Sequence, residues 1–149
     1  MSDLTIVEFL RARLYAEAQV ARVARGKCSG VWTQTDPDRA PGRIEDEVGV
    51  IVYDEGSPSK DEGAHIALQD PQHTIAGIQA ARKVLDMYEE AEVAVRPSDE
   101  GEEDYFDGVR LGLYVAVVAL AGRYSSHPDF NADWDMGTQV GGKLDGYLR

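Results

Sequence analysis

Residues 104–122 read DYFDGVRLGLYVAVVALAG and contain the longest apolar run of the chain, Leu111 to Ala121. Apolar side chains recur here at spacings of three and four, which indicates a helix that buries one face. They are Phe106, Val109, Leu113, Val117 and Leu120. The run is far shorter than the roughly 20 residues needed to cross a bilayer, and Arg110 and Arg123 flank it. We therefore expect a central core helix and no membrane span.

Two glycines lie within this predicted helix. Gly108 and Gly112, followed by Ala116, are spaced four residues apart, and each helical glycine costs about 1 kcal/mol relative to alanine. A close backbone approach would compensate that cost. We predict that another helix, from this chain or from a second copy, packs against Gly108 and Gly112.

Three more helices are predicted from the way they begin. Two capping boxes, in which a hydroxyl and a carboxylate each satisfy a free backbone N–H, and one Asp-Pro start occur along the chain. These signals are Thr5 with Glu8, Ser59 with Glu62, and Asp70-Pro71. They predict a helix over about residues 5–25, a short helix after residue 59, and a helix from residue 71 to about residue 91.

Between the first two of these helices the pattern changes from helical to extended. Val31-Trp32-Thr33 and the run from Val48 to Tyr53 are β-branched and aromatic, and the turn-rich residues 36–42 lie between them, which is typical of a small antiparallel meander. The fold class is therefore α+β and mainly helical, with three or four helices packed with this meander. We expect a single domain over residues 1–149, with a core of residues 4–135 and a C-terminal extension of residues 136–149.

The composition limits partners and location. The formal net charge is −12, which repels phosphate backbones and anionic lipids and so argues against direct binding of nucleic acid or membranes. Cys28 is the only cysteine, so an internal disulfide is excluded and a reducing compartment fits best. The N-terminus has no basic region followed by an apolar core, so it does not resemble a secretion signal. We expect a cytoplasmic protein.

The negative charge is concentrated between Asp86 and Asp107, a segment that contains ten acidic residues and a single basic residue, Arg96. Because such a surface can attract a basic partner, we list interaction candidates here. They are Asp86, Glu89, Glu90, Glu100, Glu102, Glu103 and Asp104, together with Gly108 and Gly112. The leading hypothesis is a non-enzymatic interaction module that binds a host protein or a second copy of itself. The alternative is a DNA mimic, which requires these carboxylates to form an extended double row.

Several short motifs, in this order, resemble a known family. They are residues 5–14, Gly30-Val31-Trp32, Ala64-His65-Ile66-Ala67 with Asp70-Pro71, and Tyr124 with His127-Pro128-Asp129-Phe130 and Trp134. The sequence resembles a domain-of-unknown-function family of short acidic proteins from actinomycetes and their phages, over about residues 4–135. The resemblance implies an actinobacterial or phage setting. It carries no activity, ligand or catalytic residue to transfer.

No motif assembles a chemical site. His65 and His127 form the only polar site considered, and a small metal-dependent enzyme or sensor would need both within about 10 Å, because metal ligands share one ion. No histidine or cysteine pair has diagnostic ligand spacing, and Cys28 lacks a nucleophile signature. We assign no catalytic residue, no metal and no cofactor. Trp32 and Trp134 are expected to close core edges, since large aromatics in small domains usually do so.

Overall fold

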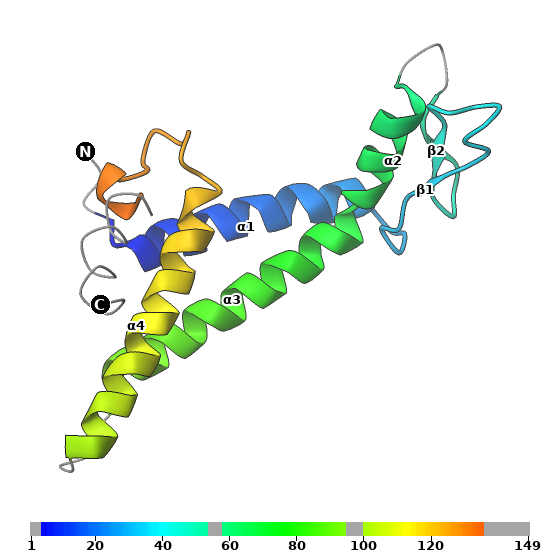
Figure 1. Cartoon of the computed structure of the whole chain (residues 1–149). Coiled ribbons are helices and arrows are strands. Elements are labelled where there is room, and N and C mark those ends of the chain that lie inside the picture. Colours follow the sequence, from blue (N-terminus) through cyan, green and yellow to red (C-terminus); the bar gives the residue numbers. More distant parts are fainter. Residues whose placement is uncertain (1–3, 54–57, 95–99, 136–149) are drawn as a thin grey trace. The chain divides into compact units, whose positions relative to one another are not determined.

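A computed structural model describes residues 4–53, 58–94 and 100–135, and within the last range the side chains from residue 104 onward. Four helices and a small three-stranded sheet follow in the order α1, β1, β2, β3, α2, α3, α4, with a short 3₁₀ helix η1 at the end (Figure 1). The helices are α1 (Ile6–Arg25), α2 (Lys60–Leu68), α3 (Pro71–Val93) and α4 (Glu100–Gly122), and η1 is Ala132–Trp134. The predicted mainly helical α+β class is confirmed.

The chain divides into two compact units. The first comprises Met1–Leu14 and Ala80–Arg149, and the second comprises Tyr15–Gln79. Each unit is described by itself below. The single domain expected from the sequence stays a prediction, because compact units need not fold separately.

α1 begins and ends at the predicted signals. The N–H of Glu8 donates to Oγ1 of Thr5 at 3.2 Å, and the N–H of Thr5 donates to Oε2 of Glu8 at 2.8 Å. These bonds from the backbone and hydroxyl of Thr5 lower the pKa of Glu8. Gly26 follows with a φ of 60°, the left-handed conformation that glycine adopts without strain. The capping box and the glycine C-cap are thus both confirmed.

In the second unit the predicted meander is present as an antiparallel sheet in the order β1-β2-β3. Its strands are β1 (Thr33–Gln34), β2 (Ile44–Glu45) and β3 (Val50–Val52). Gln34 pairs with Ile44, and Ile44 pairs with Val52. The first strand begins at Thr33, two residues later than the β-branched pattern predicts. Ile44, in the central strand, is fully buried, so the sheet forms part of a core.

α2 lies against the sheet at a point where only glycine fits. A Cβ added to Gly63 would lie 2.6 Å from the carbonyl oxygen of Pro41 and 2.8 Å from Nε2 of Gln34. The same Gln34 amide donates to the carbonyl oxygen of Lys60 at 2.8 Å, which ties β1 to the first turn of α2. The capping box of Ser59 and Glu62 starts this helix as predicted.

α3 starts at Asp70-Pro71 as predicted. Oδ1 of Asp70 accepts the N–H of His73 at 2.6 Å, and Oδ2 accepts the N–H of Trp32 at 3.3 Å. The N-cap carboxylate therefore also fixes the segment that leads into β1. The helix runs to Val93, two residues beyond the predicted end.

In the first unit the segment after α4 folds back onto the start of α1. The ring of Phe9 contacts the rings of Tyr124, Phe130 and Trp134, with centroids 6.1, 6.1 and 5.1 Å away. Phe9 and Trp134 are buried. The placement of Trp134 in the core is thereby confirmed. In the other unit Trp32 is half-buried, and no described group accepts a hydrogen bond from its buried indole N–H.

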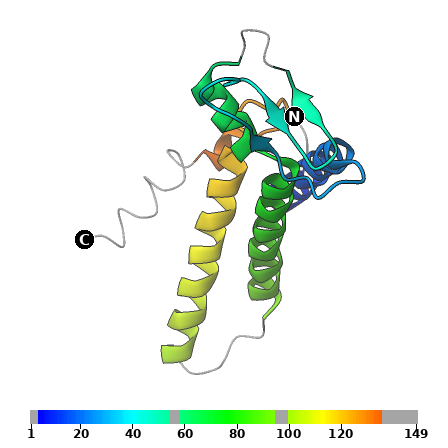
Figure 2. The same cartoon turned by 90° about the vertical axis from the view of Figure 1, so that its right-hand side faces the viewer.

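α4 is less buried than predicted. Val117, Val118 and Ala121 near its C-terminal end are buried, but Tyr105 is 68% exposed and Val109 is 39% exposed. The prediction of a central core helix is wrong for the first half of α4, because little described structure covers the apolar residues there. Figure 2 shows α4 beside the part of α3 in the same unit.

The apolar character of α4 extends beyond the run noted in the sequence. Asp104–Gly122 has a mean hydropathy of 1.4 with 17% of its residues buried, so by length and composition alone this one described helix could cross a membrane. Core helices of soluble proteins also meet this criterion. The expectation of no membrane span therefore stays a prediction.

Candidate functional site

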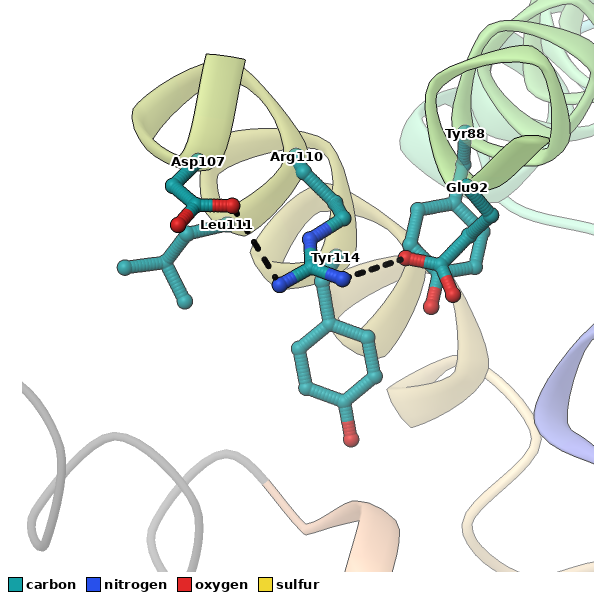
Figure 3. A pocket seen from close by; sticks show the side chains of 6 residues that line it. All are labelled: Tyr88, Glu92, Asp107, Arg110, Leu111 and Tyr114. Carbon is teal, nitrogen blue, oxygen red and sulfur yellow. Dashed lines mark ion pairs between the residues drawn. The ribbon is translucent and has the colours of Figure 1, made fainter. Parts of the chain in front are cut away.

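A pocket of about 240 Å³ lies between α3 and α4 in the first unit. Figure 3 shows that α3 contributes Tyr88 and Glu92, while α4 contributes the remaining side chains. These are Asp107, Arg110, Leu111 and Tyr114. Spacings of three and four place each set on one face of its helix. The pocket thus arises from two regular helix faces that meet.

Arg110 joins the two helices through loose ion pairs. Its guanidinium lies 3.7 Å from Oε1 of Glu92 and 3.5 Å from Oδ1 of Asp107, as the dashed lines in Figure 3 mark. Both distances exceed the roughly 2.7–2.9 Å of strong charge-assisted hydrogen bonds. All three side chains are at least 40% exposed, and exposed pairs contribute little stability. These two ion pairs therefore hold the Arg110 guanidinium only loosely.

Two tyrosine rings form the aromatic part of the pocket. The centroids of Tyr88 and Tyr114 lie 6.0 Å apart with an interplanar angle of 42°. Partial burial raises the pKa of Tyr88, and the neighbouring Glu92 carboxylate raises it further. The phenol of Tyr88 consequently stays neutral over the physiological pH range and offers its ring face and a hydroxyl.

The acidic end of α3 is partly neutralised within the chain. Arg11 of α1 pairs with Asp86, at 2.8 Å between Nη2 and Oδ1, and also with Glu89. These hydrogen bonds raise the pKa of Arg11. Because Arg11 and Arg110 each stand between two of the acidic side chains, the described carboxylates are interleaved with cations. This arrangement gives the DNA-mimic hypothesis no support among the described residues, and that hypothesis stays a prediction.

A family model matches residues 3–136 of the chain. The chain belongs to DUF6221, a family of unknown function. The resemblance found in the sequence is confirmed at the level of the family, while the actinomycete or phage origin stays a prediction. No curated protein and no solved structure matches the sequence.

Several interaction candidates of this DUF6221 chain fall outside the pocket. Asp104 and Glu90 are exposed, and the side chains of Glu100, Glu102 and Glu103 lie outside the described part of the chain. A Cβ added to Gly108 or Gly112 would meet no atom within 4 Å. The prediction that another helix of this chain packs there is therefore wrong for the described residues, and packing of a second copy stays a prediction.

The two candidate histidines, His65 and His127, belong to different units and have different surroundings. His65 is exposed on α2, beside a shallow hollow that Asp61 and Glu62 also line. His127 is half-buried, contacts Arg13 and lies 5.7 Å from the ring of Phe9. In the ranges that the structure describes, no three His, Cys, Asp or Glu side chains gather around a possible metal position. The metal-dependent alternative thus gains no ligand set from them.

The surroundings of Cys28 favour its neutral thiol. Partial burial raises the pKa of its thiol, and the carboxylates of Asp46 and Glu47 raise it further. Since the thiolate is the reactive form, this environment disfavours it.

None of the six residues that line the pocket was a candidate site residue on the basis of the sequence: Tyr88, Glu92, Asp107, Arg110, Leu111 and Tyr114. The available signal was the spacing of four between Tyr88 and Glu92 and between Arg110 and Tyr114. That spacing places each pair on one helix face. It does not say that the two faces meet.

Proposed function

We propose that this DUF6221 protein is a non-enzymatic interaction module that binds a basic and apolar segment of a partner protein at the α3–α4 pocket. The observation that carries the proposal is the lining of the pocket, where two tyrosine rings and two carboxylates adjoin an apolar side chain. The proposal keeps two expectations from the sequence. The protein is cytoplasmic, and its partner is a host protein that a phage-derived chain would bind.

The charge of the pocket favours a cationic side chain. Glu92 and Asp107 outnumber Arg110, so the two carboxylates and one guanidinium give the lining a net charge of about −1. A lysine or arginine over the face of a tyrosine gains about 0.5–2 kcal/mol from the ring. An anionic ligand would meet two carboxylates beside the one guanidinium. A partner's cation can therefore join the network that Arg110 now spans.

The surroundings favour an apolar neighbour beside that cation. Leu111 lines the pocket, and Met87 and Phe106 are exposed on the same two helices. Interfaces commonly combine a buried apolar or aromatic anchor with a polar rim. A short amphipathic segment with lysine or arginine next to leucine therefore matches the site.

The test is a titration of the ¹⁵N-labelled protein with a short amphipathic peptide of lysine and leucine, followed by backbone chemical shifts. We expect the shifts to concentrate at residues 88–92 and 107–114. Glu92→Lys should weaken binding at least about tenfold, equivalent to about 1.4 kcal/mol, because it reverses the charge at the centre of the pocket. A peptide with glutamate in place of lysine should not bind.

The matched control is Asp61→Lys. This variant changes the net charge equally but lies on α2 in the other unit, so it should leave peptide binding unchanged. Equal weakening by both variants would show attraction to the overall negative charge and would contradict a specific pocket. Shifts centred outside the pocket would do the same.

A further inference from the structure

Between Tyr105 and Gly122, one face of α4 has no charged side chain. This outer face is defined by the residues whose positions fall within a 140° arc at 100° per residue. They are Tyr105, Gly108, Val109, Gly112, Val115, Ala116, Ala119 and Gly122. It is separate from the pocket, because Asp107, Arg110 and Tyr114 fall on other sides of the helix.

The described chain covers the outer face only in part. Tyr105 and Val109 are exposed, and Val115 and Ala116 are half-buried. A Cβ added to Gly108, Gly112 or Gly122 would meet no atom within 4 Å. A soluble helix normally turns its apolar face toward a core and its charged face toward water. α4 instead presents an uncharged face to solvent in its own unit.

We propose that a second copy of this chain covers the outer face, with the two α4 helices antiparallel. The argument rests on the charges at the two ends. Asp104 precedes the uncharged stretch and Arg123 follows it, and both are exposed. An antiparallel copy brings Asp104 of each chain opposite Arg123 of the other, whereas a parallel copy would place like charges together. The opposed helix dipoles favour the same arrangement.

Other occupants fit the outer face less well. A basic segment finds no carboxylate between Asp104 and Arg123 on this face, so nothing there would attract it in preference to the acidic pocket. An anionic membrane would be repelled by the net charge of −12. The face is instead complementary to itself in both shape and charge, since small residues lie along its middle and opposite charges mark its ends.

The dimensions predict a weak dimer. From Tyr105 to Gly122 the face is about 26 Å long at 1.5 Å per residue. Its small residues allow the helix axes to approach at the short end of the usual 8–10 Å. One helix pair of this length does not reach the roughly 800 Å² per partner of a standard stable interface. We therefore expect a dissociation constant of about 10–100 µM, a range that corresponds to weak association.

Sedimentation equilibrium of the full chain over micromolar to millimolar concentrations tests the proposal. The wild type should pass from monomer to dimer. Gly112→Leu should weaken the dimer at least about tenfold, a difference of one decade in dissociation constant, because its Cβ meets no atom within 4 Å in the monomer while its side chain would block the close approach of two helices. Circular dichroism should confirm that this variant keeps its helix content.

Gly77→Leu is the matched control. Gly77 is an exposed helical glycine on α3, and a Cβ there also meets no atom within 4 Å. This variant should leave the dimer unchanged. A monomeric wild type at all concentrations, including one that binds neutral lipid vesicles instead, would overturn the proposal. So would a dimer that Gly112→Leu does not weaken.

A charge swap tests the antiparallel direction. Asp104→Arg and Arg123→Asp should each weaken the dimer, because each creates a like-charge contact at both ends. The double variant should restore it. A double variant as weak as the single ones would contradict the antiparallel pairing. Peptide binding at the pocket is measured separately, so neither outcome here decides the proposed function.

Discussion

Val109 and Val117 are the same residue about two turns apart on α4, yet one is 39% exposed and the other is fully buried. Both belong to the apolar repeat from which the sequence predicts a core helix. The two valines differ in the segments of the chain that pack against α4 beside them. η1 packs against α4, and the segment that leads to it closes the core, whereas no described segment covers Val109. Apolar periodicity therefore identifies the helix and its face, while burial depends on distant segments.

The strongest test of this difference removes the aromatic cluster that closes the core of the first unit. Phe9→Ala should cost about 3–5 kcal/mol of unfolding free energy, because it deletes a buried ring and leaves a cavity. Urea denaturation followed by far-UV circular dichroism measures the loss. A cost below about 1 kcal/mol, typical of a surface change, would show that the cluster does not hold the segment after α4 in place.

The most direct test compares the two valines themselves. Val117→Ala should cost about 2 kcal/mol, from two lost methyl groups and the space they leave. Val109→Ala should change stability by less than about 0.5 kcal/mol, since the side chain is partly solvated and alanine is the better helix former. Urea midpoints of the two variants measure the difference. Equal costs would mean that Val109 is covered in solution.

A smaller effect distinguishes glycines that are open from those in close contact. Gly108→Ala should stabilise the monomer by about 1 kcal/mol, because alanine favours the helix and its Cβ has room. Gly63→Ala should destabilise, since its Cβ would lie 2.6 Å from the carbonyl oxygen of Pro41. Thermal denaturation at low protein concentration measures both. A destabilising Gly108→Ala would reveal a neighbour at the exposed half of α4.

The smallest expected effect is a loss of stability at alkaline pH that depends on Tyr88. Its pKa is raised in the folded protein by burial and by Glu92, so the folded state holds the phenolic proton more tightly than the unfolded state. The stabilising contribution is complete below the ordinary tyrosine pKa of about 10 and is lost as the pH rises through the folded value. Tyr88→Phe should flatten the fall in urea midpoint above about pH 10. If Tyr88→Phe leaves the fall of the urea midpoint with pH unchanged, another group causes the loss of stability at alkaline pH.

Local signals in the sequence were sufficient to predict where most elements begin. The carboxylates of Glu8 and Glu62 each accept from the hydroxyl of the residue three positions earlier, and Asp70 caps the helix that follows it, so these contacts are set by neighbours along the chain. The left-handed turn at Gly26 is likewise a property of one residue. Such features do not depend on the rest of the fold.

Contacts between distant segments were not predictable in the same way. Arg11 pairs with Asp86, 75 residues later, and Arg110 pairs with Glu92 across the two helices that form the pocket. Asp86 and Glu92 each lie among other acidic residues, so the sequence alone does not show which carboxylate pairs with which arginine. The candidate acids were therefore identified as a group, while the cations that divide them, and the two tyrosines beside them, required the structure.

The two tryptophans of the chain provide one natural spectroscopic reporter in each unit. Trp134 lies in the aromatic cluster of the first unit, and Trp32 is half-buried in the second. Because the chain contains no other tryptophan, a Trp32→Phe protein emits only from the first unit and a Trp134→Phe protein only from the second. Fluorescence unfolding curves of the two variants would thus show directly whether the units melt together or in sequence.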